Sequence, residues 1–159
     1  MDATYPEIEG YRIDRELEIG GFGQIYLATR LKYARQVIVK TVKAERLTAE
    51  GLENLNQEAE LGRKFRFEPH ITEFIDFVED KYLIFEYYPD GTLREQIQKN
   101  LLMDRQSCQI IIQLCDALIR LSEKDIIHCD IKPENILIMS GKTLRIKLCD
   151  VGSSKIVSK

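Results

Sequence analysis

The sequence predicts an α+β fold for this chain of 159 residues. Short runs of β-branched and aromatic residues surround one helical segment in the first half, and a long helical pattern followed by two short strands fills the second. Hydrophobic residues make up 44% and charged residues 31%, a composition typical of globular proteins. We therefore expect a small antiparallel β part with one helix, followed by a mainly α-helical part.

The first half reads as five strands and one helix. Strands are predicted over residues 11–19, 24–29 and 36–42, and the glycines of the turn at 20–23 permit positive φ. Thr48 is a suitable N-cap for a helix that runs to about Arg66, since acidic residues stand early and basic residues late along it. Two further strands, 74–78 and 82–86, follow across a polar turn at 79–81.

The second half begins at a turn over residues 88–91, the natural linker between two lobes. Thr92 and Glu95 have the spacing of a capping box, which predicts a short helix. A longer helix is expected over 104–123, then an irregular stretch over 126–135 and a hairpin of 136–138 with 145–149. The apolar residues expected on the inward face of the long helix are Ile111, Leu114, Cys115, Leu118 and Leu121.

Charge and composition exclude several classes of protein. Lys and Arg number 23 against 26 Asp and Glu, a net charge of −3, which argues against a nucleic-acid partner. No apolar run approaches the roughly 20 residues of a membrane span, and the first residues do not resemble a signal peptide, so no membrane partner is expected. The four cysteines form no C-x-x-C pair, which predicts reduced, buried thiols in a cytoplasmic protein.

Lys40 and Glu58 need a chemical explanation. Lys40 lies in a strand whose two faces are both apolar, and Glu58 lies beside the inward face of the predicted helix. Taken singly, a strand-end lysine that reaches water and an exposed glutamate are the ordinary interpretations. An inward ammonium and an inward carboxylate in one small lobe would, however, relieve each other's cost of desolvation.

A second group of polar residues follows the long helix. Asp130, Lys132 and Asn135 stand within six residues on a loop that apolar runs bracket, and Asp150 ends an apolar strand. Oxygen ligands from Asn135 and Asp150 suit Mg²⁺, Asp130 could accept a hydroxyl proton, and Lys132 could neutralise a phosphoryl group in transit. A simply solvated loop is the alternative. The turn at 20–23 likewise fits either a plain β-turn or a cradle for phosphate oxygens.

Together these residues resemble the protein-kinase family, in the signature order that runs from a glycine loop through Lys40 and a helix glutamate to His128-x-Asp130 and Asp150-x-Gly152. The resemblance covers about residues 11–154. The run from Asp130 to Asn135 is similar to the serine/threonine type. The resemblance to this family implies a small antiparallel β lobe with one helix over residues 11–88 and a partial, mainly helical large lobe over 89–159, with 1–10 as an extension.

The resemblance also implies roles for individual residues. Asp130, Lys132 and Asn135 would be catalytic, and Asn135 and Asp150 would bind Mg²⁺. ATP would be the nucleotide and a protein the phosphoryl acceptor. The residues implied in nucleotide binding are Ile19, Gly20, Gly21, Gly23, Ile25, Ile38, Lys40, Glu58, Phe85, Glu86 and Tyr88.

Several positions depart from the family pattern. Glu18 replaces the first loop glycine, Cys129 replaces an arginine, and Val151 replaces a phenylalanine. Gly62 stands where a leucine is usual, which predicts a loosened Glu58 helix. The chain ends at Lys159, before the rest of a kinase large lobe, so we also expect an uncovered apolar patch on the long helix. The sequence therefore leaves two alternative functions. The chain is either a serine/threonine kinase that uses ATP and Mg²⁺ or a catalytically silent kinase-like module that regulates a partner.

Overall fold

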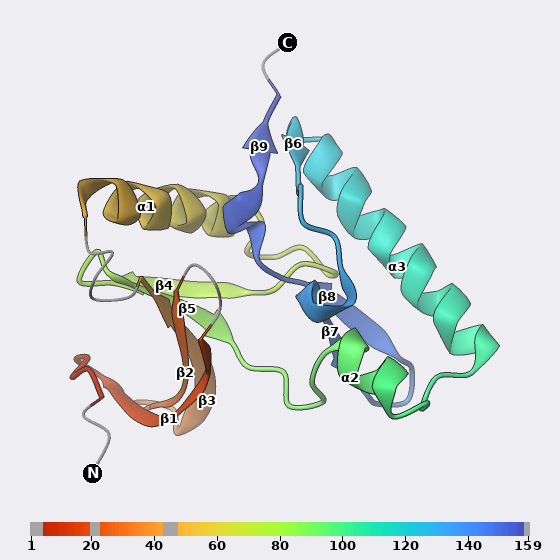
Figure 1. Ribbon diagram of the computed structural model, residues 1–159, viewed down its shortest axis with the longest axis horizontal. Coiled ribbons are helices and arrows are strands. Elements are labelled where there is room, and N and C mark those ends of the chain that lie inside the picture. Colours follow the sequence, from red (N-terminus) through yellow and green to blue (C-terminus); the bar gives the residue numbers. More distant parts are fainter. Residues whose placement is uncertain (1–4, 20–22, 43–47, 158–159) are drawn as a thin grey trace. The chain divides into compact units, whose positions relative to one another are not determined.

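The computed structural model describes residues 5–19, 23–42 and 48–157 (Figure 1). These residues form two compact units. The first unit comprises the described residues of 1–63 together with 74–87, and the second comprises 64–73 with the described residues of 88–159. The α+β fold class predicted from the sequence is confirmed, because a five-stranded antiparallel sheet stands in the first unit and the long helix in the second.

The first unit is built on a sheet with the strand order β1-β2-β3-β5-β4. Every neighbouring pair in it is antiparallel. Hairpin connections account for three of these pairs, whereas β3 and β5 are joined through helix α1 (Ala49–Lys64) and β4. All five strands stand where the sequence predicts them, within one residue at each end. Their bounds are Tyr11–Ile19 (β1), Gln24–Arg30 (β2), Arg35–Thr41 (β3), Phe74–Val78 (β4) and Tyr82–Glu86 (β5).

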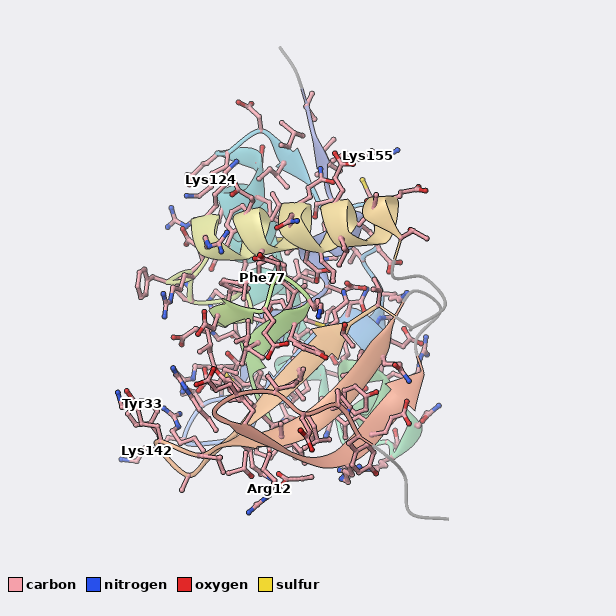
Figure 2. All side chains as sticks on the ribbon, turned by 90° about the vertical axis from the view of Figure 1, so that its left-hand side faces the viewer. Arg12, Tyr33, Phe77, Lys124, Lys142 and Lys155 are labelled. Atoms are coloured by element: carbon pink, nitrogen blue, oxygen red, sulfur yellow. The ribbon has the colours of Figure 1, made fainter. Side chains whose placement is uncertain are left out.

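The two faces of this sheet carry separate apolar clusters. One face packs around Tyr26, Val39 and Ile84, and Ile8 from the segment before β1 is buried in the same cluster. The other face packs around Phe74 and Leu83 against helix α1, Ala49–Lys64. Figure 1 shows α1 alongside β4 and β5, and Figure 2 shows Phe77 of β4 next to the helix. A strand with both faces covered explains the continuous apolar run of β3.

Helix α1 begins as the sequence predicts, because the Thr48 Oγ1 accepts a hydrogen bond of 3.2 Å from the Gly51 N–H. The expectation that Gly62 loosens this helix is not supported by the packing. A Cβ added at Gly62 would lie 2.7 Å from Cγ of the Phe74 ring. Phe74 is itself buried and makes an edge contact with Phe85, at 5.6 Å between ring centroids. The aromatic ring therefore occupies the space that a leucine at this position would fill.

The second unit combines two helices with short strands. Strand β6 pairs with β9, and β7 pairs with β8, in two separate antiparallel pairs. The sequence predicted the β7–β8 hairpin but not the β6–β9 pair, in which Ile126 faces Ile156. The bounds are Leu93–Gln98 (α2), Asp104–Ser122 (α3), Ile126–Ile127 (β6), Pro133–Asn135 (η2), Ile136–Met139 (β7), Arg145–Leu148 (β8), Val151–Ser153 (η3) and Lys155–Ile156 (β9).

The inward face of α3 differs from the prediction. Ile110, Ala117 and Leu121 are buried, and Leu114 and Leu118 are half-buried. Two residues predicted to face inward, Ile111 and Cys115, are exposed instead. The prediction of buried thiols is also wrong, because Cys108 and Cys129 are exposed as well and Cys149 is half-buried. Together with Ile112 and Ile119, which are 62% and 53% exposed, Ile111 and Cys115 leave an apolar stripe on the surface of the helix. The expected uncovered apolar patch is therefore present, on a neighbouring face of α3.

Residues 64–73 are anchored to β8 inside the second unit. The Thr72 N–H donates to the Leu148 carbonyl at 2.9 Å, and the Leu148 N–H donates to the His70 carbonyl at 2.8 Å. The Lys147 Nζ donates to the Ile71 carbonyl at 3.1 Å. This backbone pairing joins the segment after α1 to the strand that leads to Asp150. Within the part of the chain that the structure describes, no helix has both the length and the apolar character needed to cross a bilayer.

Candidate active site

Four residues implied in nucleotide binding share one face of the sheet in the first unit. Ile25 lies opposite Lys40, and Ile38 lies opposite Phe85. Ile38 and Lys40 are two residues apart on β3, so their side chains point to the same side. That side is the one that α1 covers, because Phe85 packs against the cluster of Leu55, Phe74 and Leu83. The sequence thus places an ammonium among apolar side chains on a single surface.

Lys40 and Glu58 form an ion pair across that face. The Nζ of Lys40 donates to Oε1 of Glu58 at 2.8 Å. Their side chains are 20% and 7% exposed, so both charges are largely removed from water. Burial of this kind is tolerated when the charges are paired and hydrogen-bonded. The predicted pairing of an inward ammonium with an inward carboxylate is therefore present.

The turn that precedes β2 is described only in part. Gly23 is buried, and a Cβ added to it would lie 2.5 Å from the carbonyl oxygen of Thr41, so only glycine fits there. Gly20 and Gly21 lie outside the described residues. Glu18 and Ile19 belong to β1 by their backbone, and their side chains are likewise outside the described part. The proposed cradle over phosphates stays a prediction.

Glu86 and Tyr88 stand at the end of the first unit and the start of the second. The Glu86 carboxylate accepts a hydrogen bond of 3.2 Å from Arg35. Tyr88 is buried, and its hydroxyl accepts a hydrogen bond from the Glu73 N–H at 3.4 Å. Both side chains are thus held by protein partners, so their implied role in binding adenine rests on their backbone groups.

The second unit holds a polar cluster around Asp130. The Nζ of Lys132 donates to Asp130 Oδ2 at 2.7 Å, and the Asn135 Nδ2 donates to the same oxygen at 2.9 Å. Asn135 Nδ2 also donates to the Asp130 carbonyl oxygen at 2.9 Å. Pro133 opens the short helix η2, which brings Asn135 back toward Asp130. One carboxylate oxygen is thus fixed by two donors, and the loop residues chosen from the sequence lie together.

These contacts shift the acid–base behaviour of the loop. The hydrogen bond from Lys132 is the main cause that lowers the pKa of Asp130, and the bond from Asn135 adds to it. The same contact raises the pKa of Lys132. Since each charged form stabilises the other, Asp130 is a carboxylate and Lys132 an ammonium over the whole physiological pH range.

His128 is a positioning residue of this loop to which the sequence assigned no role. Its ring is buried; Nε2 lies 2.9 Å from the Cys149 carbonyl oxygen, and Nδ1 accepts the Asp130 N–H at 3.3 Å. These partners fit the neutral tautomer with its proton on Nε2. Burial lowers the pKa of His128, which agrees with that neutral form. A polar residue between two apolar runs, 126–127 and 136–138, was the available signal.

Asp150 is joined to the same loop through the backbone. The N–H of Cys149 donates to the carbonyl oxygen of Asn135 at 2.9 Å. Asp150 has φ of 62° and ψ of 55°, and Cys129 has φ of 66°, so two residues in this region adopt the left-handed conformation that non-glycine residues rarely take. Such conformations recur at active sites, where surrounding contacts hold them in place.

The family model described as "Protein kinase domain" matches residues 11–159. The chain is 38% identical to Aurora kinase C of Mus musculus over 152 residues, 92% of this chain and 54% of that protein. It is 36% identical to Aurora kinase B of Mus musculus, over 92% of this chain and 43% of that protein. It is 34% identical to the serine/threonine-protein kinase ULK3 of Xenopus laevis, over 96% of this chain and 34% of that protein.

The chain belongs to the protein kinase family. Its relatives place it with the serine/threonine type, as the run from Asp130 to Asn135 predicted. It spans about half or less of the length of these relatives. The family match covers the residues of both sets described above.

The metal that kinases use can be tested against this donor set. In the described residues, no three His, Cys, Asp or Glu side chains gather as a metal-binding group. Mg²⁺ takes one or two protein carboxylates and completes its shell with water and phosphate oxygens, so a smaller set suffices. Asp150 offers a carboxylate. In the described residues the Asn135 side chain forms its hydrogen bonds through Nδ2, and its Oδ1 accepts none from the protein. The residues present therefore fit Mg²⁺ together with a nucleotide.

Proposed function

We propose that this chain takes part in ATP- and Mg²⁺-dependent transfer of a phosphoryl group to serine or threonine hydroxyls of proteins. The observation that carries the proposal is the Asp130 carboxylate, fixed by Lys132 at 2.7 Å and Asn135 at 2.9 Å on one oxygen. In the described residues, the second carboxylate oxygen, Oδ1, accepts no side-chain hydrogen bond and can accept one from a hydroxyl group. Membership of the kinase family supports the same reaction.

The chemistry asks for positioning and charge neutralisation rather than covalent participation. The hydroxyl oxygen bonds to the γ-phosphorus, the bond to the β–γ bridging oxygen breaks, and ADP leaves. Asp130 orients the hydroxyl and takes its proton as the new bond forms. Because the pKa of Asp130 is lowered, it is always in the accepting form but is a weak base, so orientation is its larger contribution. Lys132 places positive charge where the transferred group is most negative.

The first unit would hold the nucleotide. Lys40, kept in place by Glu58, would contact the α- and β-phosphates, and the backbone of Gly20, Gly21 and Gly23 would cover them. The apolar residues Ile19, Ile25, Ile38 and Phe85 would enclose the adenine. The backbone groups of Glu86 and Tyr88 would bond its edge.

Mg²⁺ would be held by Asn135 and Asp150. When bound, it neutralises charge on the phosphates and orients them. The hydrogen bond from the Cys149 N–H to the Asn135 carbonyl keeps the two ligand-bearing segments together before nucleotide binds. Our proposed division of the chain follows the family pattern, with 1–10 as an extension, 11–88 as the small lobe and 89–159 as a partial large lobe. The cytoplasmic location stays a prediction from the sequence.

Transfer of phosphate from labelled ATP to a generic protein substrate tests the proposal. Asp130→Asn keeps the shape of the side chain and removes its charge, and we expect kcat to fall about a hundredfold to ten-thousandfold. Lys155→Ala, an exposed position in the same unit, is the matched control and should leave kcat unchanged. Equal activity of the wild-type chain and Asp130→Asn would defeat the proposal.

A catalytically silent module that binds and regulates a partner is the second candidate. The exposed apolar stripe on α3, with Ile111, Ile112 and Ile119 all more than half exposed, favours it, because such surfaces commonly mark interfaces. Thermal unfolding with Mg·ATP separates the two functions. A kinase should gain stability from Mg·ATP, and the absence of a shift with or without the metal would favour the silent module.

A further inference from the structure

We propose that a hollow between α3 and the β7–β8 hairpin binds a phosphorylated segment of a partner protein. The hollow has a volume of about 380 Å³ and lies entirely within the second unit. Its polar lining consists of Arg105, Gln106 and Gln109 from α3 and Ser140, Lys142 and Thr143 from the hairpin turn. None of these residues takes part in the phosphoryl transfer proposed above, so the inference does not depend on that function.

The walls of the hollow are fixed to each other. The Gln113 Nε2 of α3 donates to the Leu144 carbonyl at 3.0 Å, and the Gln113 Oε1 accepts the Ile146 N–H at 3.0 Å. On the other side of the turn, the Ser140 N–H donates to Asp90 Oδ2 at 2.6 Å. Figure 1 shows α3 beside the β7–β8 hairpin, in agreement with their contacts. The hollow is therefore formed before any ligand binds, which lowers the entropic cost of binding.

Its charge is positive and uncompensated. Arg105 and Lys142 line the hollow, and no Asp or Glu does. Some cations of this unit do have carboxylate partners in the described residues: Arg94 pairs with Glu134, and Arg120 with Glu123. Arg105 and Lys142 form no such pair. Two unpaired cations at one hollow, in a chain of net charge −3, point to an anionic ligand.

The backbone of the turn adds hydrogen-bond donors. In the described part of the chain, the N–H groups of Gly141, Lys142 and Thr143 donate to no other protein group. Successive unbonded N–H groups in a turn form a concave site that favours anions. The Asp90 carboxylate, which contacts the turn, accepts the Ser140 N–H and does not line the hollow. Figure 2 shows Lys142 at the surface, where an arriving ligand can reach it.

Size and lining favour a peptide over a free phosphate ion. A volume of about 380 Å³ lies within the range of about 300–1,000 Å³ typical of pockets for organic ligands. The amides of Gln106 and Gln109 and the hydroxyls of Ser140 and Thr143 can bond the main chain of an extended peptide. The two cations and the turn N–H groups would then receive the phosphoryl group.

Fluorescence anisotropy with the full 159-residue chain tests the inference. The probe is a fluorescein-labelled peptide of alanine and glycine with one central phosphoserine between two glutamates, and its unphosphorylated form is the comparison. We expect the phosphorylated peptide to bind at least about tenfold more tightly. Lys142→Glu and Arg105→Glu should each weaken that binding at least about tenfold. Lys155→Glu, the same charge change at an exposed site elsewhere in the unit, should weaken it less than about twofold.

Amide NMR of the isotope-labelled chain locates the bound peptide. The N–H signals of Gly141, Lys142 and Thr143 should move on titration with the phosphopeptide, and far-UV circular dichroism should show that each variant stays folded. Equal loss of affinity in Lys142→Glu and Lys155→Glu would show a general electrostatic attraction and overturn the inference. So would unshifted turn signals, or displacement of the peptide by inorganic phosphate at the peptide's own concentration.

Discussion

A short lysine–carboxylate pair lies among the described residues of each unit of this kinase domain, and the two pairs differ in surroundings rather than in length. Lys40 and Glu58 are 2.8 Å apart with side chains 20% and 7% exposed, whereas Lys132 and Asp130 are 2.7 Å apart with side chains 46% and 34% exposed. The first joins a strand to a helix, and the second joins two residues of one loop. Equal distances therefore conceal different energetic roles.

The difference follows from the local dielectric. A charge pair in a dry interior interacts much more strongly than one at the surface, and loss of one partner leaves a desolvated charge behind. A pair exposed to water is screened and contributes little to stability. We therefore expect the Lys40–Glu58 pair to support the fold of the first unit, and the Lys132–Asp130 pair to contribute little to stability, in agreement with its proposed role in holding a carboxylate for reaction.

The largest expected effect on stability comes from breaking the buried pair. Lys40→Met removes the cation beside a carboxylate that is 7% exposed. Removal of one partner from a buried pair costs about 3–5 kcal/mol. Because Lys40 keeps some contact with water, we expect the free energy of unfolding to fall by about 2–3 kcal/mol. Urea unfolding followed by circular dichroism measures this loss.

Two further variants sharpen that comparison. Lys132→Met, the same substitution in the exposed pair, should leave the urea midpoint unchanged within error. Lys40→Met combined with Glu58→Leu should recover much of the loss, because no buried charge remains. Equal destabilisation by Lys40→Met and Lys132→Met would show that burial does not separate the two pairs.

A smaller effect is expected from packing at Gly62. Gly62→Ala should improve helix propensity by about 1 kcal/mol, yet its Cβ would stand 2.7–2.9 Å from three atoms of Phe74. Overpacking of this kind costs about 1–3 kcal/mol, so we expect a net loss on the order of 1 kcal/mol by urea unfolding. In a Phe74→Leu background the same substitution should cost less. A stabilising Gly62→Ala in the wild-type chain would show that the ring does not fill this space.

In the second unit, the buried side chain of His128 should make the free energy of unfolding depend on pH. Burial lowers the pKa of His128 below its ordinary value of 6.5. As the pH falls through 6.5, the unfolded chain takes up a proton at this position before the folded chain does, so the free energy of unfolding should decrease, and the decrease should level off below the folded pKa. The hydrogen bond with the Cys149 backbone and the charges of Asp150 and Asp130 raise this pKa and Lys132 lowers it, without reversing the effect of burial.

Unfolding measured by urea at several pH values between 7.5 and 5 tests this dependence. His128→Gln should abolish the part of the slope that begins near pH 6.5, whatever its effect on overall stability. His70→Gln, the other histidine of the chain, should retain that part. An unchanged slope in His128→Gln would assign the dependence to other groups.

The smallest effect is expected at the surface pair of Arg94 and Glu134, which are 2.8 Å apart. Arg94→Ala should leave the urea midpoint unchanged within error. The hydrogen bond from Arg94 is the main cause that lowers the pKa of Glu134, so Arg94→Ala should raise that pKa toward the ordinary value of 4.5. Carboxyl NMR titration of Glu134 measures the change, and a Glu134 pKa that does not move in Arg94→Ala would contradict the assignment.

Local patterns were sufficient to predict most elements. The strands of the first unit follow from alternating or continuous apolar runs between turns, and the Thr48 cap follows from its side chain. The Lys40–Glu58 pair could be predicted because each residue alone is unusual in an apolar surrounding. The cluster around Asp130 could be predicted because its polar residues are close in sequence, so a short helical turn is enough to bring them into contact.

Long-range packing accounts for what the sequence did not predict. Three consecutive isoleucines at 110–112 fit more than one face of α3, and Ala117 gives almost no hydrophobic signal, so the buried face was placed wrongly. The β6–β9 pair joins two-residue strands about thirty residues apart, too short for periodicity to reveal. Phe74 fills the space at Gly62 from another element, which no local pattern records. The hydrogen bond of His128 to the Cys149 carbonyl is likewise a contact between distant segments.

Calorimetric titration of ATP into the chain, with and without Mg²⁺, tests the central claim most directly. The account predicts that Mg²⁺ tightens ATP binding to the wild-type chain, that Asp150→Asn removes this gain, and that Lys40→Met weakens binding whether or not the metal is present. ATP binding that is indifferent to Mg²⁺, or equal affinity in Lys40→Met and the wild-type chain, would contradict it.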